Sequence, residues 1–159
     1  MIREEVFQAT KKVFGLYGAF FEVVAQEIGI EKALSLHVRA HETLGIKAGK
    51  ALREAVGTAG CDIPKLGTIL RESNLSIGIE SELKHADATS AVFHNLRCPL
   101  YEGYRIGGLD EHTAEALCQH GAPAKLGSTL RQLNPNLTHR ITRYRTRLDE
   151  PCEEEIALG

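Results

Sequence analysis

The stretch Leu75-Ser-Ile-Gly-Ile-Glu-Ser-Glu-Leu83 decides the fold, because the spacing of apolar residues changes there. Before it, apolar residues recur every three or four positions, which is typical of amphipathic helices. Within it they alternate with polar residues, which predicts a half-buried strand. The sequence therefore predicts a helical first part followed by a β-sheet.

A second alternating segment follows the polar turn at residues 86–87 and predicts a hairpin. Its core face is expected to carry Val92, His94, Leu96 and Cys98. Folding the chain about this turn sets Ile79 opposite His94 and Leu75 opposite Cys98. The apolar faces of the two strands then coincide, which makes the register self-consistent.

Three helices are predicted before this hairpin. The first covers residues 2–28 and ends at Gly29, and the second covers residues 31–56. The third starts at Asp62 as N-cap, with Pro64 in its first turn. The inward face of the second helix is expected to carry Leu34, Val38, Leu44, Ala48, Ala51, Leu52 and Val56.

After the hairpin, residues 100–109 are expected to form a loop, followed by a helix from the N-cap Asp110 to the C-cap Gly121 and a short helix over 125–133. A last hairpin is predicted from strands 137–148 and 152–158. Its arginines and glutamates are expected to pair across the strands: Arg140, Arg143, Arg145 and Arg147 with Glu153, Glu154 and Glu155.

These elements define an α+β fold in which N-terminal helices pack on an antiparallel sheet of two hairpins with an inserted helix. We expect one domain over residues 1–159. Residues 1–72 form its helical part, and residues 73–159 form its sheet part, with the inserted helix at 110–121. A length of 159 residues fits one domain.

Charge and hydropathy exclude several classes of protein. A net charge of -2 does not suit a nucleic-acid-binding protein, whose surface is usually basic. The polar start of the chain does not resemble a signal peptide, and no apolar run reaches the roughly 20 residues needed to cross a bilayer. We therefore expect a cytoplasmic protein with no membrane or nucleic-acid partner. Its cysteines are then thiols, ligands or nucleophiles rather than disulfides.

Three of the four cysteines lie in the second half of the chain and are expected to meet in space. Cys98, Cys118 and Cys152 fall at or near the ends of different elements, where they can bind a metal ion, with zinc the leading candidate and iron or an iron–sulfur cluster as alternatives. The competing interpretation is three small buried side chains, because free cysteine packs as a hydrophobe. Cys61 is interpreted as structural.

The fourth ligand of such a metal site is left open between two residues. Glu115 precedes Cys118 by three positions on a helix, and His120 follows it closely. His94 and Cys98 share a strand face but lie roughly 13 Å apart, at about 3.3 Å per residue, so they cannot bind one ion. His94 and His120 are instead candidates for moving a proton.

Three further arrangements carry alternatives. His37 and His41 have the i, i+4 spacing that lets two imidazoles share an ion, although an exposed polar face explains it as well. Arg143, Arg145 and Arg147 are able to bind a carboxylate or phosphate. Cys118 near a helix C-terminus is a weaker nucleophile than Cys98, because the negative end of the helix dipole raises a thiol pKa.

The C-terminal two-thirds of the chain resembles the L-2-amino-thiazoline-4-carboxylic acid hydrolase-like proteins. The resemblance rests on Arg97-Cys98-Pro99-Leu100 closing a strand, Cys118 on the next helix, Asn134-Pro135 before a strand, and Asp149-Glu-Pro-Cys152 in the last hairpin. This family looks related in fold to the 4-vinyl-reductase domains, which are ligand-sensing modules. The resemblance implies a helical layer against an antiparallel sheet and a homodimer through the N-terminal helices.

The resemblance also implies hydrolysis at a C–N bond of a small cyclic amidine. In this hypothesis a metal on the three cysteines activates water, or one thiolate attacks the amidine carbon. The alternative is a non-enzymatic module that senses a small ligand or a metal, as the 4-vinyl-reductase domains do. A third possibility is a structural dimer with buried cysteines and no ligand.

Overall fold

The computed structural model describes residues 2–57 and 62–159, which form five helices and a four-stranded antiparallel sheet. In chain order the elements are α1 (Glu4–Ile28), α2 (Ile30–Val56), α3 (Ile63–Ser76), β1 (Glu80–Ala86), β2 (Ser90–Arg97), α4 (Pro99–Ile106), α5 (Glu111–Arg131), β3 (Leu137–Arg143) and β4 (Cys152–Leu158). The predicted α+β class is confirmed. Cys61, interpreted above as structural, lies outside the described residues.

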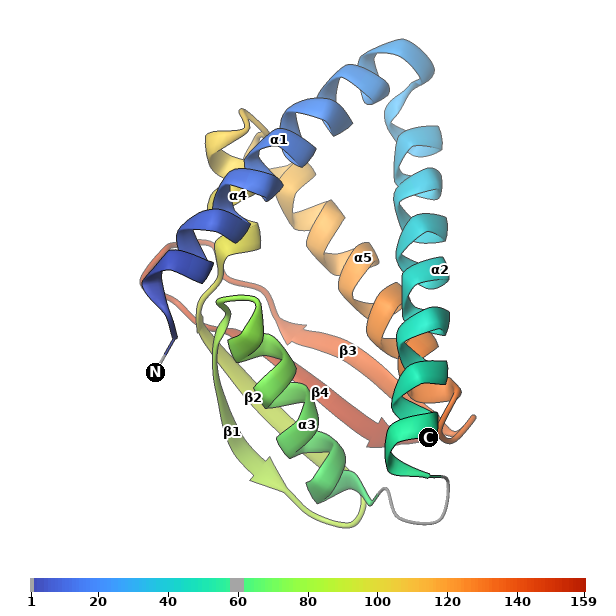
Figure 1. Ribbon diagram of the computed structural model, residues 1–159. Coiled ribbons are helices and arrows are strands. Elements are labelled where there is room, and N and C mark those ends of the chain that lie inside the picture. The colour runs from blue at the N-terminus through green and yellow to red at the C-terminus, as the bar shows by residue number, and fades with distance from the viewer. Residues whose placement is uncertain (1, 58–61) are drawn as a thin grey trace.

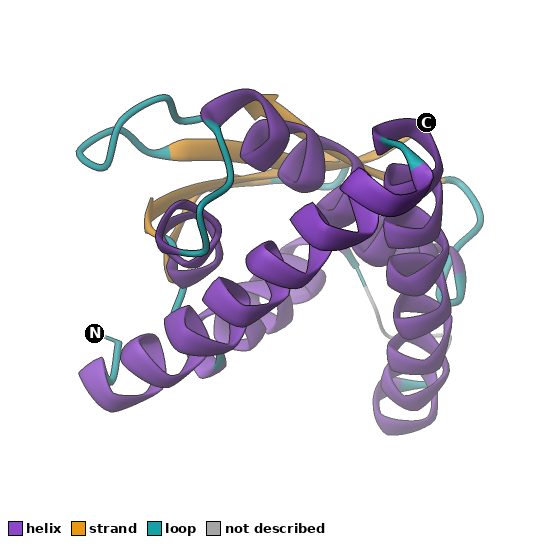
Figure 2. Ribbon diagram, turned by 90° about the horizontal axis from the view of Figure 1, so that it is seen from above, coloured by secondary structure: helices purple, strands orange, loops and turns teal. Residues whose placement is uncertain are grey.

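The sheet consists of the two predicted hairpins joined side by side. Its strand order is β1-β2-β4-β3, so β2 and β4 pair in the centre and connect the hairpins. Figure 2 shows the strands gathered at one side of the molecule.

One face of the sheet is covered by α3 and α5. Their apolar side chains form a core with the inner face of the strands, made of Ile63, Leu66, Leu70, Ala91, Phe93, Leu130, Leu137 and Ile156. A second core joins α1, α2, α4 and α5 around Phe21, Ala33, Tyr104, Leu109, Ala114 and Leu117. In Figure 1, α1 and α2 meet at a sharp bend and diverge like the limbs of an inverted V. Gly29 makes the bend with φ of 88°, a conformation that favours glycine.

The first hairpin differs from the prediction in its register. Glu82, rather than Ile79, pairs with His94, and α3 continues to Ser76, so Leu75 belongs to a helix. The turn is longer than expected because Asp87 accepts hydrogen bonds from the backbone N–H groups of Thr89 and Ser90. The strands also contain two register shifts.

The predicted core face of β2 is wrong by one residue. Ala91, Phe93 and Asn95 are buried, and the intervening residues point to the other face. A slip of one position exchanges the two faces of a strand, since side chains alternate. Cys98 consequently lies beyond the strand, where it is the N-cap residue of α4.

The predicted loop at 100–109 is largely helical, and the predicted helix end at Gly121 is wrong. Pro99 starts α4, a role that proline fills well at a first helical position. The helix α5 runs unbroken through Gly121 and Pro123 to Arg131. Gly121 is needed for packing rather than for capping, because a Cβ there would collide with Nε2 of His37 on α2.

The inward face of α2 is also different from the prediction. Its buried residues are Ala33, His37, Gly45 and Gly49, and Leu44 is 54% exposed. Small residues allow α2 to approach α5 closely. Of the larger residues predicted for this face, Leu34 and Leu52 are half-buried against the two cores. The first helix likewise exposes Val13, Leu16, Phe20 and Val23. None of the helices in the described part is long and apolar enough to cross a membrane.

Candidate active site

A cavity of about 140 Å³ lies between the inner face of the sheet and the helices, and it is lined by all three C-terminal cysteines. Cys98 reaches it from the start of α4, Cys118 from the middle of α5, and Cys152 from the start of β4. The prediction that these cysteines lie close together is supported at the level of a shared cavity. All three are free thiols.

Two of these thiols resist ionisation. Burial raises the pKa of Cys98 to about 11, in spite of backbone N–H groups of α4 that favour its thiolate. Burial, and next the neighbouring Cys98, raise the pKa of Cys118 well above its ordinary value. Both side chains are therefore protonated at neutral pH and serve better as cavity walls than as nucleophiles.

Cys152 has a different environment, because Arg145 donates to its sulfur. The backbone N–H and the Nε–H of Arg145 lie 3.3 and 3.4 Å from Cys152 Sγ. A positive charge and two donors on a sulfur are the arrangement that activates cysteine nucleophiles. Of the three cysteines, Cys152 is the one equipped for attack.

Arg145 is itself held rigidly. It is 1% exposed, and it donates to the carbonyl oxygens of Asn95 and Leu96 while its guanidinium lies over the ring of Tyr101 at 5.6 Å from the ring centroid. The predicted ladder pairing of this arginine with the glutamates of β4 is wrong, because its side chain turns inward. Of the ion pairs predicted between these arginines and the glutamates of β4, the one that forms across β3 and β4 joins Arg140 and Glu155.

Glu154 brings a half-buried carboxylate to the same cavity. It lies two residues after Cys152 on β4, and its oxygens accept hydrogen bonds from Asn95 Nδ2 at 2.8 Å and His139 Nε2 at 3.0 Å. The Nδ1 atom of His139 is buried without a partner, so a proton there would be an unsatisfied donor. Donation from Nε2 to Glu154 therefore satisfies this ring without placing an unpaired N–H at Nδ1.

Tyr144 adds an unsatisfied hydroxyl to this wall. Its Oη is buried and has no partner of good geometry, although it lies close to the thiol of Cys118. Buried polar groups in folded proteins are nearly always paired with protein or with a bound molecule. The Tyr144 hydroxyl is thus available to a ligand in the cavity.

His41 and Lys125 line the helical side of the cavity. The Nδ1 atom of His41 lies 2.9 Å from the carbonyl oxygen of His37, so it donates a proton there and Nε2 carries the free lone pair. Burial, more than the nearby Lys125 charge, lowers the pKa of His41 and keeps the ring neutral. A neutral imidazole with a free nitrogen is suited to proton transfer.

His37, in contrast, is fully engaged in packing. Its Nε2 donates to the carbonyl oxygen of Leu117 at 2.9 Å, and its Nδ1 accepts from the hydroxyl of Tyr17 at 2.7 Å. Neither nitrogen is left for a metal ion. The suggestion that His37 and His41 share an ion is therefore wrong.

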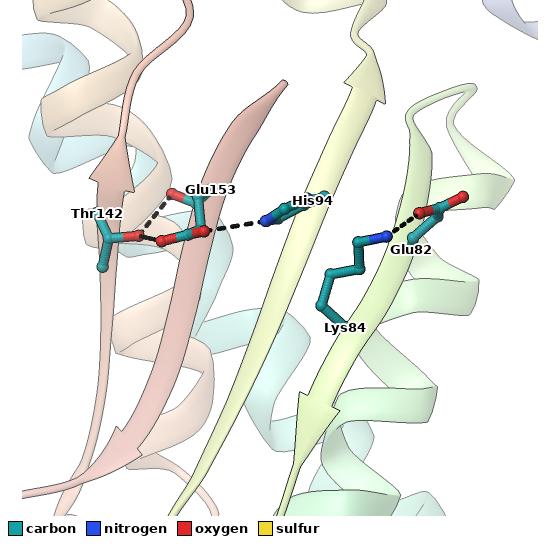
Figure 3. Close-up of polar contacts among 5 residues, drawn as sticks. All are labelled: Glu82, Lys84, His94, Thr142 and Glu153. Carbon is teal, nitrogen blue, oxygen red and sulfur yellow. Dashed lines mark hydrogen bonds and ion pairs between the residues drawn. The ribbon is translucent and has the colours of Figure 1, made fainter. Parts of the chain in front are cut away.

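The other predicted site residues lie away from the cavity wall. His94 is on the opposite face of the sheet, where its Nε2 lies 2.9 Å from Glu153, which also accepts from Thr142 (Figure 3). His120 is exposed on α5, and Glu115 is half-buried on the same helix; neither lines the cavity. The structure thus brings together the three predicted cysteines without the predicted histidines and glutamate.

Within residues 2–57 and 62–159, no group of three or more His, Cys, Asp or Glu side chains is close enough to hold a metal ion. The cysteines share a cavity but do not form a ligand cluster as they are arranged. The predicted zinc site, with Glu115 or His120 as fourth ligand, stays a prediction.

Sequence reasoning missed Asn95, Glu154 and the residues around them. The sequence predicts Glu154 only as one of three glutamates that pair with arginines across the last hairpin. Strand alternation contained the missing signal, because residues 152 and 154 must point to the same face. The face of β4 that carries Cys152 therefore also carries the carboxylate of Glu154.

The fold and the site define a class: an α+β domain whose helices and sheet enclose a small cavity with a thiol, a carboxylate and an imidazole on its walls. The family model of L-2-amino-thiazoline-4-carboxylic acid hydrolase matches residues 8–141, and the chain belongs to this family. The family resemblance in the sequence is thereby confirmed. A search of curated proteins gives no match. The matched range includes Cys98 and Cys118 and ends before Cys152 and Glu154.

Proposed function

We propose that this chain is a hydrolase that acts at a C–N bond of a small cyclic amidine, with the cysteine-lined cavity as its active site. The observation that carries the proposal is the pair on β4: Cys152 with a guanidinium on its sulfur, and Glu154 as a half-buried carboxylate that lines the same cavity. An amidinium is planar and cationic, so it complements a carboxylate through two parallel hydrogen bonds. A volume of about 140 Å³ favours a ligand below the drug-sized range.

In the proposed reaction Glu154 orients the amidinium and the Cys152 thiolate adds to the amidine carbon. The ring C–N bond breaks, and the departing nitrogen takes up a proton. Water then adds to the same carbon and gives up a proton, the bond from that carbon to the Cys152 sulfur breaks, and the ring-opened product leaves with the thiolate restored. Arg145 stabilises the thiolate at the beginning and the end of this cycle. No step requires a metal.

Three histidines are candidates for the proton transfer. His41 lines the cavity with its free Nε2, whereas His94 and His120, predicted from the sequence, do not line it. We propose His41 for this role. Replacing His41 by Gln is expected to lower kcat by about tenfold or more, and the same change at His94 or His120 to leave it within about twofold. Equal losses at His94 and His41 would argue for the sequence-based assignment.

The direct test is incubation of the purified protein with 2-amino-thiazoline-4-carboxylate, followed by mass spectrometry of the product. Addition of one water to the ring compound is the expected result. Cys152→Ser and Glu154→Gln should each reduce kcat/KM by at least about a hundredfold, and Cys98→Ser should be much less harmful. If the wild-type protein produces no ring-opened compound at any pH between 6 and 9, the hydrolase proposal is abandoned.

The alternative function is a non-enzymatic sensor of a small ligand or a metal. It is favoured by the two protonated thiols, which leave much of the cavity wall without reactive groups. Saturable binding of the amidine without turnover, unchanged in Cys152→Ser, would select this alternative. Turnover that depends on Cys152 would exclude it.

We further propose that two copies of the chain associate through α1. Its exposed Val13, Leu16, Phe20 and Val23 follow helical spacing and form one apolar stripe. Apolar patches of this kind on a soluble domain usually mark an interface. Phe20→Glu should shift a dimer to a monomer in analytical ultracentrifugation, and Leu148→Glu, which changes an exposed apolar residue elsewhere, should not. A wild-type monomer at high concentration would contradict the proposal.

We also propose that the protein is located in the cytoplasm. The three cysteines of the described chain are free, and a reducing compartment keeps thiols in this state. Fractionation of cells that express the tagged protein tests this point.

A further inference from the structure

We infer that His139 is a positioning residue for Glu154: together with Asn95, it holds the carboxylate in a fixed orientation, in which both oxygens keep an acceptor position for a planar cation. The inference rests on the proposed function, because it takes the cavity to bind an amidinium. It assigns a role to a buried histidine that does not itself line the cavity.

The two oxygens of Glu154 each accept one hydrogen bond, and the donors are different residues. Oε1 accepts from Asn95 Nδ2 at 2.8 Å, and Oε2 accepts from His139 Nε2 at 3.0 Å. A carboxylate has about four acceptor positions, so each oxygen retains one for a ligand. The last torsion of a glutamate side chain is soft, and a carboxylate held at one oxygen can still turn about it. Donors on both oxygens remove this freedom.

The register of the sheet places these donors on opposite sides of Glu154. Its direct partners across the strands are apolar, Phe93 on β2 and Ile141 on β3. Asn95 and His139 lie diagonally from it, toward opposite ends of β4, and diagonal positions are within reach of long side chains. The carboxylate on the central strand is therefore bridged to both neighbouring strands.

Both donors are themselves held in place. The side chain of His139 is 1% exposed, and its Nδ1 atom has no partner among the described residues, so its N–H is the one that points at Glu154. Asn95 is buried as well, and Nδ2 of Asn74 on α3 lies 3.5 Å from its Oδ1, which leaves the Asn95 Nδ2 for the carboxylate. A binding group supported in this way on strands is positioned accurately before a ligand arrives.

The opposite face of the sheet contains a similar contact that serves as a comparison. There Nε2 of His94 lies 2.9 Å from a carboxylate oxygen of Glu153, the residue before Glu154 on β4 (Figure 3). Neither of these two residues lines the cavity. Loss of a histidine–glutamate contact should therefore affect ligand binding on the cavity face and leave it unchanged on the other face.

Two ligands of the same ring size test the inference: 2-amino-2-thiazoline, a cyclic amidine, and thiazolidin-2-one, in which an uncharged carbonyl group replaces the amidine. Calorimetry should show that the wild type binds the amidine about tenfold or more tightly than the carbonyl compound. In His139→Leu this preference should fall by at least about threefold. His139→Gln, whose amide can donate in place of the ring, should retain most of it. His94→Leu is the matched control and should keep the full preference.

A double-mutant cycle shows whether His139 acts through Glu154. In a Glu154→Gln protein, the further change His139→Leu should alter the preference by less than about twofold. Should His139→Leu fail to fold, Asn95→Leu, which removes the donor to the other oxygen, takes its place in the cycle. An equal effect of the substitution with and without the carboxylate would overturn the inference.

These binding measurements separate the inference from the proposed function. A preference for the amidine that depends on His139, without any hydrolysis, would refute the hydrolase and keep the positioning role. Hydrolysis that depends on Cys152, with the full preference retained in a folded His139→Leu protein, would keep the hydrolase and overturn the inference. A wild type with no preference for the amidine would overturn the inference as well.

Discussion

Arg145 and Cys152 are joined by two hydrogen bonds, in which the backbone N–H and the side-chain Nε–H of the arginine both point at the cysteine sulfur. The arginine lies at the end of the β3 side of the hairpin and the cysteine starts β4. The hairpin brings the cation to the thiol, and the carbonyl oxygens of Asn95 and Leu96 on the neighbouring strand hold the guanidinium in place.

The three cysteines should consequently differ in reactivity. Under native conditions at pH 7, iodoacetamide should modify Cys152 at least about tenfold faster than Cys98, whose pKa is raised to about 11 by burial. Peptide mass spectrometry over time measures each rate. Arg145→Lys keeps a charge and the backbone N–H donor but loses the Nε–H donor, and should slow the labelling of Cys152 alone. Faster labelling of Cys98 would contradict the assignment of the nucleophile.

The zinc prediction is checked by elemental analysis of protein purified without added metal. A site on the three cysteines should give about one equivalent of zinc, and Cys118→Ser should lower both metal content and stability. Cys61→Ser serves as the control, since Cys61 is not part of the predicted site. Absence of metal with all thiols reactive after unfolding would leave the cavity as a thiol site.

Acid should destabilise the fold through His37. Burial, with a smaller contribution from His41, lowers the pKa of His37 from 6.5 to about 4 in the folded protein. The unfolded chain takes up this proton near its ordinary pKa, so acid favours unfolding. The stabilisation is complete above about pH 6.5 and is lost as the pH falls toward 4, by roughly 3 kcal/mol in total.

Urea unfolding of the wild type and of His37→Gln at several pH values measures this effect. The free energy of unfolding of the variant should depend less on pH between 7 and 4, by about the amount given above. His112→Gln, at an exposed position, should follow the wild-type curve. Parallel curves for wild type and His37→Gln would show that another group carries the acid sensitivity.

Two glycines on the packed helices should respond in opposite directions to alanine. At Gly45 a Cβ meets the Lys125 carbonyl and approaches Ser128 Cβ at 2.9 Å, so Gly45→Ala should destabilise by about 1–3 kcal/mol. At Gly127 the nearest atoms belong to the flexible end of Arg131, and Gly127→Ala should stabilise by about 0.5–1 kcal/mol. Thermal unfolding of both variants measures the difference. Stabilisation by Gly45→Ala would refute the close crossing.

The sequence predicted the fold class because hydrophobic period and helix-start signals are local. The Asp62 cap is an example, since its side chain accepts from the Lys65 N–H as expected. Local patterns did not predict where α4 begins and where α5 ends, because tertiary contacts determine these positions. Gly121 has the character of a helix end, yet it is a glycine because His37 occupies the space of a side chain. Pro99 ends a strand and also starts α4.

The site was predicted only in part for a similar reason. The cysteines are recognisable in the sequence because thiols bind metals and act as nucleophiles. Their positions near the ends of predicted elements indicate that they can meet. The face of β2 depended on a hairpin register that a side-chain hydrogen bond of Asp87 sets. With the register displaced, His94 was assigned to the core and Asn95 was overlooked. The site role of Glu154 was not predicted, because Glu153 and Glu155 on either side of it suggested a strand whose glutamates all form ion pairs.

The walls of the cavity come from three of the strands and all five helices, from Phe14 on α1 to Glu154 on β4. A ligand that fits there has no binding partner in the unfolded chain, so occupancy raises the melting temperature of the whole domain. A compound held at a hundred times its dissociation constant adds about 2.7 kcal/mol of stability. A thermal-shift screen of small cyclic amidines can therefore identify ligands of the cavity independently of any turnover.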